Sequence, residues 1–465
     1  MPECLHKVEN HCFREHAQHF VLDVRRSRVF ASSLLEQEIL AAPEGAPLEA
    51  LPVLLGQKYE ETEISRALER LRKRNLLLSH PAPLEKATAL IFPAITHLQL
   101  CAAQDCNLRC RYCIVEQGSF GGPRHRMSRE VARQAVDFLI RESGDAAVCT
   151  LSFSGGEPML NWAVVRDAIS YCQEQAARHG KQVRYVLKTN GTLFDDESIA
   201  FIKEHKIRIQ LSLDGPPTVH DRMRACASGH GSHDMVMASL AKLLPACGEQ
   251  VIIMATLTCF SPPFSELLDY LIRFGAGNVC LSPVIARESD YTFDSAGIER
   301  LKAEYTQLAG RFLAGEPACS VGGAIFGYIA QFRGGKQQCD RSAGGQYLVV
   351  SASGGIYPQP EMVGKEEYRL GQLAMGLDRD KLASWRSYHD VDNRPVCREC
   401  WARYICGGGC VGASIKLQGT LDQPIETECE LIRHLIKLAI WVQSTLRERR
   451  SRAVEEATRA LLDEV

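Results

Sequence analysis

Long apolar runs and an excess of charge of one sign are both missing from this sequence. No stretch approaches the roughly 20 apolar residues of a membrane-spanning helix, and the first residues, MPECLHKVENHC, lack the apolar core of a signal peptide. The formal net charge is -2 and the isoelectric point is about 6.7, so no global positive field favours nucleic acid or an anionic membrane. We therefore expect a cytoplasmic protein that binds neither a membrane nor nucleic acid.

Cysteine, in contrast, is abundant, with 19 in 465 residues. In a short secreted chain this count would indicate disulfides, but a chain of this length can bury two or three hydrophobic cores without them. Metal binding or redox chemistry is the better explanation. Several cysteines lie in apolar segments and are expected to be small core residues: Cys101, Cys149, Cys172, Cys226, Cys247, Cys259 and Cys280.

Residues 1–85 are expected to form a first domain. Alternation of apolar residues predicts two strands, HFVLDV and SRVFAS, and a closing strand, LLLS. Helices are expected between them at Leu34–Ala41, Leu48–Gly56 and Glu61–Asn75. This order resembles the winged-helix module called a RiPP recognition element, which binds the leader of a ribosomally made precursor peptide along a strand edge. A wing that only caps the next domain, or one that contacts DNA, stays open as an alternative.

Between residues 90 and 310, short apolar runs alternate with helical stretches, as in repeated strand-helix units. Six strands are expected, with the sequences THLQLCA, CTLSFS, VRYVLKT, IRIQLSL, VIIMATL and NVCLSPV. The pattern predicts an α/β fold, a partial (β/α)6 barrel whose ligands bind at the carboxyl ends of its strands.

The first of these strands is followed directly by CNLRCRYC, which contains Cys106, Cys110 and Cys113. Three thiolates on one loop can hold three irons of a 4Fe–4S cluster and leave the fourth iron open. The spacing resembles that of the radical SAM superfamily, in which the open iron chelates S-adenosylmethionine (SAM) and an electron splits it into a 5'-deoxyadenosyl radical. A zinc knuckle or a ferredoxin-like cluster is the alternative.

Motifs at the ends of the next strands match the same superfamily. They are SGGEP, KTNG, SLDG and HDRMR, and all four are expected at one mouth of the barrel. The resemblance implies that the carboxylate of Glu157 meets the methionine ammonium and that Arg224 clamps an anion. The residues that it assigns to cofactor binding are Tyr112, Gly155, Gly156, Glu157, Pro158, Asn190, Ser212, Asp214 and Arg224.

From residue 311 to residue 430, regular periodicity weakens and cysteine spacing becomes the main signal of a metal-organised domain. CRECWARYICGGGC resembles the SPASM domain, a carboxyl-terminal extension that holds two auxiliary iron-sulfur clusters. By that pattern one cluster is bound by Cys397, Cys400, Cys406 and Cys429. The other draws on Cys410, Cys339 and Cys319. Residues 431–465 are expected to form one or two amphipathic helices.

The second auxiliary cluster lacks one ligand of the family pattern. Where that pattern has a cysteine four residues after a glycine, the run SASGGIYPQ has Gln359. Either Gln359 is a weak ligand or a spectator, or an iron stays open for a substrate thiolate beside the carbon radical, which is the interpretation that we favour. A smaller 2Fe–2S or three-iron centre that only transfers electrons is the alternative.

The order of the three expected domains is that of radical SAM/SPASM maturases of ribosomally made peptides. EQGSFGG after the cysteine loop and the hairpin around Asp23 look most like thioether-forming maturases, which act on ranthipeptides or on the small subunit of quinohemoprotein amine dehydrogenase. The resemblance implies that hydrogen is abstracted from a leader-bearing peptide or small protein subunit, that a substrate cysteine sulfur captures the carbon, and that flavodoxin or ferredoxin supplies electrons.

Three other functions stay open at this point. A sulfatase-type maturase would convert cysteine or serine to formylglycine, and another SPASM peptide oxidase would form a carbon-carbon crosslink. A non-catalytic iron-sulfur sensor would bind DNA through the amino-terminal wing and would not cleave SAM.

Overall fold

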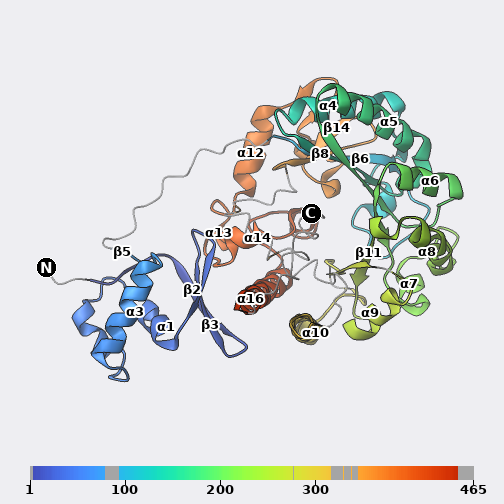
Figure 1. Ribbon diagram of the computed structural model, residues 1–465. Coiled ribbons are helices and arrows are strands. Elements are labelled where there is room, and N and C mark those ends of the chain that lie inside the picture. Colours follow the sequence, from blue (N-terminus) through green and yellow to red (C-terminus); the bar gives the residue numbers. More distant parts are fainter. Residues whose placement is uncertain are drawn as a thin grey trace.

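The computed structural model describes residues 4–78, 94–275, 277–287, 289–315, 328, 337 and 344–448. An N-terminal module of residues 4–78, a partial barrel and a cysteine-rich C-terminal region follow one another along the chain (Figure 1). Cys319 and Cys339 lie outside the described residues. No helix in the described ranges combines the length and the apolar character that a membrane crossing needs.

The N-terminal module contains a three-stranded antiparallel sheet of order β2-β3-β4 and a set of short helices. Its strands are β1 (His6–Lys7), β2 (Asn10–Glu15), β3 (Gln18–Asp23), β4 (Arg28–Ser32) and β5 (Leu77–Leu78). Its helices are α1 (Leu34–Ala41), η1 (Leu48–Ala50), α2 (Leu51–Leu54) and α3 (Glu61–Lys73). The two expected strands and three helical stretches are present, but β2 was not expected. The expected closing strand pairs with β1 instead of the hairpin.

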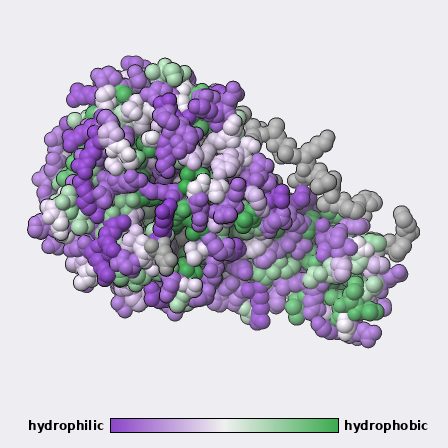
Figure 2. All heavy atoms as spheres, turned by 180° about the vertical axis from the view of Figure 1, so that it is seen from behind, coloured by the Kyte–Doolittle hydropathy of each residue, from purple (hydrophilic) through white to green (hydrophobic). Residues whose placement is uncertain are grey.

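Local sequence explains where the module's helices begin. The hydroxyl of Ser33 accepts a hydrogen bond from the backbone N–H of Glu36, and the Glu36 carboxylate accepts one from the N–H of Ser33, which together form a capping box. Figure 2 shows apolar side chains on the surface of this module, where Leu34, Val53 and Leu54 are 51, 70 and 49% exposed.

The barrel contains the six expected strands, all parallel, in the order β12-β11-β10-β9-β8-β6. They are β6 (His97–Gln104), β8 (Val148–Gly155), β9 (Gln182–Thr189), β10 (Arg208–Ser212), β11 (Val251–Leu257) and β12 (Asn278–Pro283). The intervening helices are α4 (Arg129–Glu142), α5 (Trp162–Arg178), α6 (Asp196–Glu204), α7 (Pro217–Met223), α8 (His233–Cys247), α9 (Phe264–Ile272) and α10 (Ser295–Leu313). Short elements are η2 (Glu116–Gly118), β7 (His125–Arg126), η3 (Pro158–Asn161) and η4 (Gly248–Gln250). The α/β fold class is confirmed.

The barrel sheet continues into the C-terminal region. Strand β13 (Tyr347–Val350) pairs in parallel with β6, and β14 (Gly355–Tyr357), β15 (Gly371–Gln372) and β16 (Gly376–Leu377) extend the sheet with antiparallel pairs. The first part of the cysteine-rich region therefore shares a sheet with the strand that precedes the cysteine loop.

Helices make up most of the remaining C-terminal region. They are η5 (Pro360–Met362), η6 (Glu366–Tyr368), α12 (Arg379–His389), α13 (Pro395–Arg398), α14 (Arg403–Cys406), α15 (Val411–Gln418) and α16 (Glu426–Glu448). Helix α16 packs along α10 and begins before residue 431. Its buried face contains Leu431, Leu435, Leu438 and Val442, as the amphipathic pattern predicted.

Candidate functional site

Cys106, Cys110 and Cys113 lie on the loop that leaves the carboxyl end of β6. Backbone hydrogen bonds hold this loop against the end of α7, from Arg109 N to Ala225 O at 2.7 Å and from Arg111 N to Met223 O at 2.9 Å. Two of the sulfurs accept hydrogen bonds from backbone N–H groups of the same loop. The Leu108 N–H donates to Cys106 Sγ at 3.4 Å, and the Gln117 N–H donates to Cys113 Sγ at 3.0 Å.

The three thiols fit an iron-sulfur cluster better than a single ion. Burial, and more weakly the neighbouring thiols of Cys110 and Cys113, raise the pKa of Cys106 to about 12. Thiolates at these positions therefore need compensating positive charge, which bound iron supplies. Within the described ranges, no three His, Cys, Asp or Glu side chains meet closely enough for one metal ion. Each thiolate of a cluster binds a different iron, so such convergence is not required.

The SGGEP turn packs directly against the start of the cysteine loop. Gly156 N donates to Ala103 O at 2.8 Å, and Glu157 N donates to Asp105 O at 2.8 Å. A Cβ on Gly156 would lie 2.1 Å from Asp105 O, so only glycine allows this approach. The two neighbouring strand ends are thereby held together beside Cys106.

Glu157 is fully buried, and its carboxylate accepts three hydrogen bonds from the chain. Oε1 accepts from Met159 N at 3.0 Å and from Thr189 Oγ1 at 2.8 Å, and Oε2 accepts from Asn190 N at 2.7 Å. Burial raises its pKa to about 7 against the opposing effect of these bonds. A carboxylate can accept about four hydrogen bonds, so the SGGEP carboxylate already organises the KTNG strand end and keeps room for one further donor.

Asn190, the third residue of KTNG, lies against the cysteine loop. Its Nδ2 donates to Asn107 Oδ1 at 2.8 Å and is 3.8 Å from Cys106 Sγ. Asn107 Nδ2 donates in turn to Thr192 Oγ1 at 2.8 Å. The amide network fixes the residue next to Cys106. Asn107 and Thr192 were not among the expected site residues because their role depends on contacts between separate strand ends.

A buried ionic network joins the SLDG and HDRMR motifs to the same loop. Arg224 Nε donates to Asp214 Oδ2 at 3.0 Å, and the Tyr112 hydroxyl donates to the same oxygen. Asp214 Oδ1 accepts from Thr256 N at 3.0 Å, and Arg224 Nη1 is 3.9 Å from Cys110 Sγ. Arg224 therefore places positive charge beside a cysteine sulfur. Ser212, at the end of β10, is half-buried.

The four cysteines expected to hold one auxiliary cluster lie near one another. Cys397 is on α13, Cys406 ends α14, and Cys429 is in the first turn of α16. Burial raises the pKa of Cys406, and the thiols of Cys429 and Cys400 raise it further. Burial and, more weakly, the neighbouring thiol of Cys397 raise the pKa of Cys429 to about 12. The carboxylate of Glu428 raises the pKa of both Cys406 and Cys429 as well. The four cysteines stay the expected ligands of one auxiliary cluster.

Gln359 and Glu361 both lie against the first turn of α15, whose N-cap is Cys410. Cys410 Sγ accepts a hydrogen bond from Ala413 N at 3.5 Å and caps the helix. A Cβ on Gly412 would lie 2.7 Å from Gln359 Oε1, which places the Gln359 amide against the first turn of α15. Gln359 is 7% exposed.

Helix α15 also contacts the cysteine loop of the barrel. Lys416 Nζ donates to Ile114 O, next to Cys113, and to Glu116 Oε1 at 3.2 Å. One short helix thus carries Cys410 at its N-cap and a contact with the barrel loop in its last turn. This link was not expected from the sequence.

A cavity of about 670 Å³ lies between the end of β12 and the start of α16. Its lining is largely apolar and includes Pro283, Val284, Phe293, Leu431 and Ile432. Glu428, which accepts a hydrogen bond from Cys410 N at 2.9 Å, also contributes to the wall. The volume is sufficient for side chains of a peptide.

Comparison with known proteins agrees with this geometry. Residues 102–257 match the model of the Radical SAM superfamily. A cysteine-type anaerobic sulfatase-maturating enzyme from Clostridium novyi is 25% identical over 337 residues, which cover 66% of this chain and 86% of that protein. A serine-type counterpart from Klebsiella aerogenes is 24% identical over 325 residues, covering 66% and 76%.

Solved structures share the fold. The structure of native anSMEcpe with bound AdoMet has a TM-score of 0.64 at 20% identity and covers 76% of this chain and 99% of that chain. Streptococcus suis SuiB bound to precursor peptide SuiA has a TM-score of 0.50 at 14% identity and covers 91% and 99%. The barrel is a radical SAM domain related to those of sulfatase-maturating enzymes. The chain is accordingly an enzyme of radical chemistry that uses a 4Fe–4S cluster and SAM.

Proposed function

We propose that this enzyme modifies a peptide and forms thioether crosslinks between a cysteine sulfur and a carbon atom of a ribosomally made precursor. The observation that carries the proposal is the position of Gln359 beside the N-cap of α15, where Cys410 lies. The family pattern has a cysteine at this place. An auxiliary cluster held by Cys410, Cys339 and Cys319 would then have an iron without a protein thiolate, and a substrate thiolate could bind there.

The residues of the barrel mouth hold and orient the cofactors in this proposal. Cys106, Cys110 and Cys113 would hold the cluster, which with SAM supplies the hydrogen-abstracting radical. Arg224 offsets negative charge at Cys110, and Asn190 fixes the loop beside Cys106. Gly155 and Pro158 complete the turn that carries the buried carboxylate. The other auxiliary cluster, on Cys397, Cys400, Cys406 and Cys429, would accept the surplus electron that the peptide releases when the crosslink forms. A flavodoxin or ferredoxin would supply the electron that splits SAM.

Leader binding is proposed for the groove between β4 and α3. Strand β4 is an edge strand, to which an extended peptide can add by backbone hydrogen bonds. A cavity of about 390 Å³ lies beside it and is lined by Arg28, Phe30, Lys73 and Arg74, and by Gln443 and Arg447 of α16. Its positive charge favours an acidic leader. SuiB, which shares the fold, was solved with its precursor peptide, and this supports a precursor peptide as the substrate.

A test of leader binding reverses one charge in this groove. Arg28→Glu should weaken binding of an acidic leader peptide at least tenfold, because it places a carboxylate beside the edge strand. Fluorescence anisotropy with a labelled leader measures this, and Arg178→Glu on the distant helix α5 is the control. Equal affinity in both variants would contradict leader binding at β4.

Formylglycine formation is the second candidate, because the similarity to sulfatase-maturating enzymes covers 66% of the chain. The two reactions leave different products. A thioether removes two hydrogen atoms and one free thiol and creates no aldehyde, whereas formylglycine reacts with hydrazides. A carbon-carbon crosslink would also remove two hydrogen atoms but would leave every thiol free.

The deciding experiment begins with the anaerobically reconstituted enzyme. Wild-type protein should convert SAM to 5'-deoxyadenosine, and the variant with Cys106, Cys110 and Cys113 changed to Ala should not. Cys280→Ala, a β12 cysteine outside the expected ligand sets, is the control. Co-expression with a cysteine-containing peptide encoded beside the gene then tests the product by mass, thiol alkylation and hydrazide labelling. A hydrazide-reactive product would overturn the thioether proposal, whether every thiol stays free, as after oxidation of a serine, or one thiol is lost, as after oxidation of a cysteine.

A further inference from the structure

The N-terminal module is packed against the segment that carries three of the auxiliary cysteines. One face of its sheet, with Phe13, Phe20 and Leu22, shares a hydrophobic core with residues of that segment and of α16, including Cys397, Ala402, Tyr404, Ile405, Ile436 and Ile440. Trp401, directly after Cys400, stacks on His11 of β2 with ring centroids 4.2 Å apart and an angle of 3°. The expected leader-binding module and the expected cluster-binding segment are therefore one packed unit.

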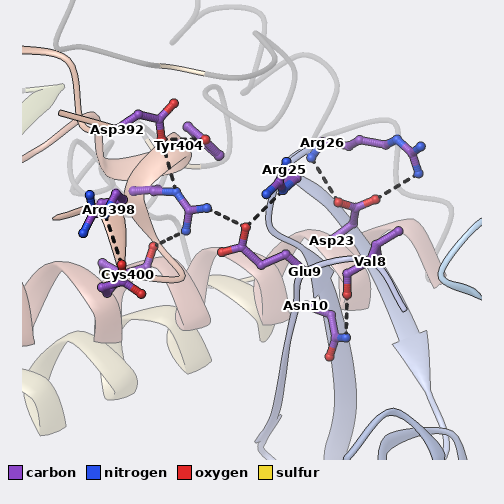
Figure 3. Close-up of polar contacts among 12 residues, drawn as sticks. Val8, Glu9, Asn10, Asp23, Arg25, Arg26, Asp392, Arg398, Cys400 and Tyr404 are labelled. Atoms are coloured by element: carbon purple, nitrogen blue, oxygen red, sulfur yellow. Dashed lines mark hydrogen bonds and ion pairs between the residues drawn. The ribbon is translucent and has the colours of Figure 1, made fainter. Parts of the chain in front are cut away.

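A charge bridge crosses this contact (Figure 3). Glu9 Oε2 accepts a hydrogen bond from Arg403 Nη2 at 2.6 Å and one from Arg25 Nε at 3.3 Å. Arg403 Nη1 donates to the backbone oxygen of Cys400 at 3.0 Å. The Arg403 side chain is only 6% exposed, and Asp392 Oδ1 lies 3.6 Å from its Nε. The Glu9 carboxylate of the N-terminal module thus fixes the Arg403 guanidinium, which in turn donates a hydrogen bond to the backbone of Cys400.

We propose that Glu9 is a positioning residue for the auxiliary cluster at Cys400 and sets the electrostatic environment of that cluster through Arg403. This rests on the proposed ligand set Cys397, Cys400, Cys406 and Cys429. Without the carboxylate, Arg403 stays beside Cys400 with less negative charge to balance it. Excess positive charge stabilises the reduced cluster, which is the more negative form. Loss of Glu9 therefore makes this cluster easier to reduce.

The position of Arg25 extends the bridge to the other side of the module. Arg25 lies in the turn between β3 and β4, directly before the edge strand proposed for the leader. It shares Glu9 Oε2 with Arg403. A peptide added to β4 would end near this turn, so Glu9 puts the proposed leader site and the cluster segment in polar contact.

The test is an EPR-monitored redox titration of full-length protein in which Cys106, Cys110 and Cys113 are changed to Ala, so that only auxiliary clusters contribute. In Glu9→Gln the ratio of reduced to oxidised cluster at a fixed solution potential should rise about tenfold, which is about 59 mV for one electron. Glu9→Asp keeps the charge, so its reduction potential should be close to that of the parent. Glu44→Gln, which removes a carboxylate paired with His6 in the same module, should leave the potential unchanged.

Potentials that are equal in Glu9→Gln and its parent would overturn the inference. Trp401 fluorescence reports whether the module stays docked, and an undocked module with an unchanged potential would overturn it as well. A Glu44→Gln shift as large as that of Glu9→Gln would do the same, because the effect would not pass through Arg403. Parent protein without iron at Cys400 would instead refute the proposed ligand set, and the bridge with it.

Discussion

Glycines of the SGGEP turn show how single residues control the cysteine loop. The second glycine, Gly156, has no strained backbone dihedral angle. Its position against Asp105 O nevertheless leaves no space for a methyl group. The same turn carries the buried carboxylate of Glu157, whose bonds to Met159, Thr189 and Asn190 join two strand ends. Small changes here are expected to move the loop that carries Cys106.

Gly156→Ala is expected to destabilise the fold by about 2 kcal/mol and to lower SAM cleavage at least tenfold, because the strand ends must separate to admit the methyl group. Urea denaturation and 5'-deoxyadenosine formation measure the two effects. Gly310→Ala, in α10 with nothing within 4 Å of its Cβ position, is the matched control and should be neutral or slightly stabilising. Similar results for both variants would contradict the steric argument.

A half-buried histidine at the opposite end of the barrel should make stability depend on pH. Burial lowers the pKa of His97 to about 3, well below its usual value near 6.5, and Lys188 adds to this effect. The unfolded chain binds this proton below about pH 6.5, and the folded chain does not. The free energy of unfolding should then fall by about 1 kcal/mol per pH unit as pH decreases from 6 to 4.

His97→Gln removes the titrating group while keeping a donor for Ser152, which lies 2.8 Å from His97 Nε2. Urea denaturation of the variant and the parent between pH 7 and pH 4 should show a shallower decline in the variant. His179→Gln, on an exposed helix end, is the control and should leave the slope unchanged. Parallel slopes for His97→Gln and its parent would contradict the prediction.

At the scale of elements, α15 joins the two cysteine regions. Its first turn follows Cys410, and its last turn places Lys416 against the loop after Cys113. Helix α16 has a comparable role, since its first turn carries Cys429 and its length packs on both α10 and the N-terminal sheet. Both helices position cysteines that are proposed to bind clusters, and they do so by contacts with segments far away in the sequence.

Lys416→Met should loosen the cysteine loop, because the Ile114 carbonyl loses its partner at a cost of about 1–3 kcal/mol. We expect faster loss of iron from the SAM-cleaving cluster in the presence of a chelator and an unchanged EPR signal of the auxiliary clusters. Lys381→Met at the start of α12 is the control. Equal rates of iron loss in both variants would contradict a role of α15 in holding the loop.

At the scale of the whole molecule, the N-terminal module covers part of the C-terminal region. The sheet face that contacts α16 and the Trp401 segment is apolar, and Val391, Ile436 and Ile440 beneath it are almost fully buried. Strand β4, proposed for the leader, is an edge strand of the same sheet. The module therefore combines a covering role with the proposed binding role.

Removal of residues 1–78 should expose this apolar face. Val391, Ile436 and Ile440 would each lose about 1.5–3 kcal/mol of the stabilisation that burial provides. We therefore expect aggregation and loss of auxiliary iron from the shortened chain. Size-exclusion chromatography with iron analysis measures both, and the full chain is the reference. A monodisperse shortened chain with full iron content would show that the module is only an appendage.

The sequence alone was sufficient for features that depend on local pattern. Apolar runs and intervening helical stretches predicted the six parallel strands, and the helix expected at Leu34–Ala41 is present as α1. Cys106, Cys110 and Cys113 were recognisable because one short loop must carry all three thiolates. The amphipathic face of α16 was likewise visible in residue spacing.

Contacts between segments distant in the sequence required the tertiary structure. The pairing of β1 with β5 and the addition of β13 to the barrel sheet depend on long-range pairing that short periodic patterns do not encode. The same holds for the network of Tyr112, Asp214 and Arg224 and for the bridge from Glu9 to Arg403. Local composition determines which residues can bind metal or form strands, whereas packing of the whole chain decides which charged groups are buried together.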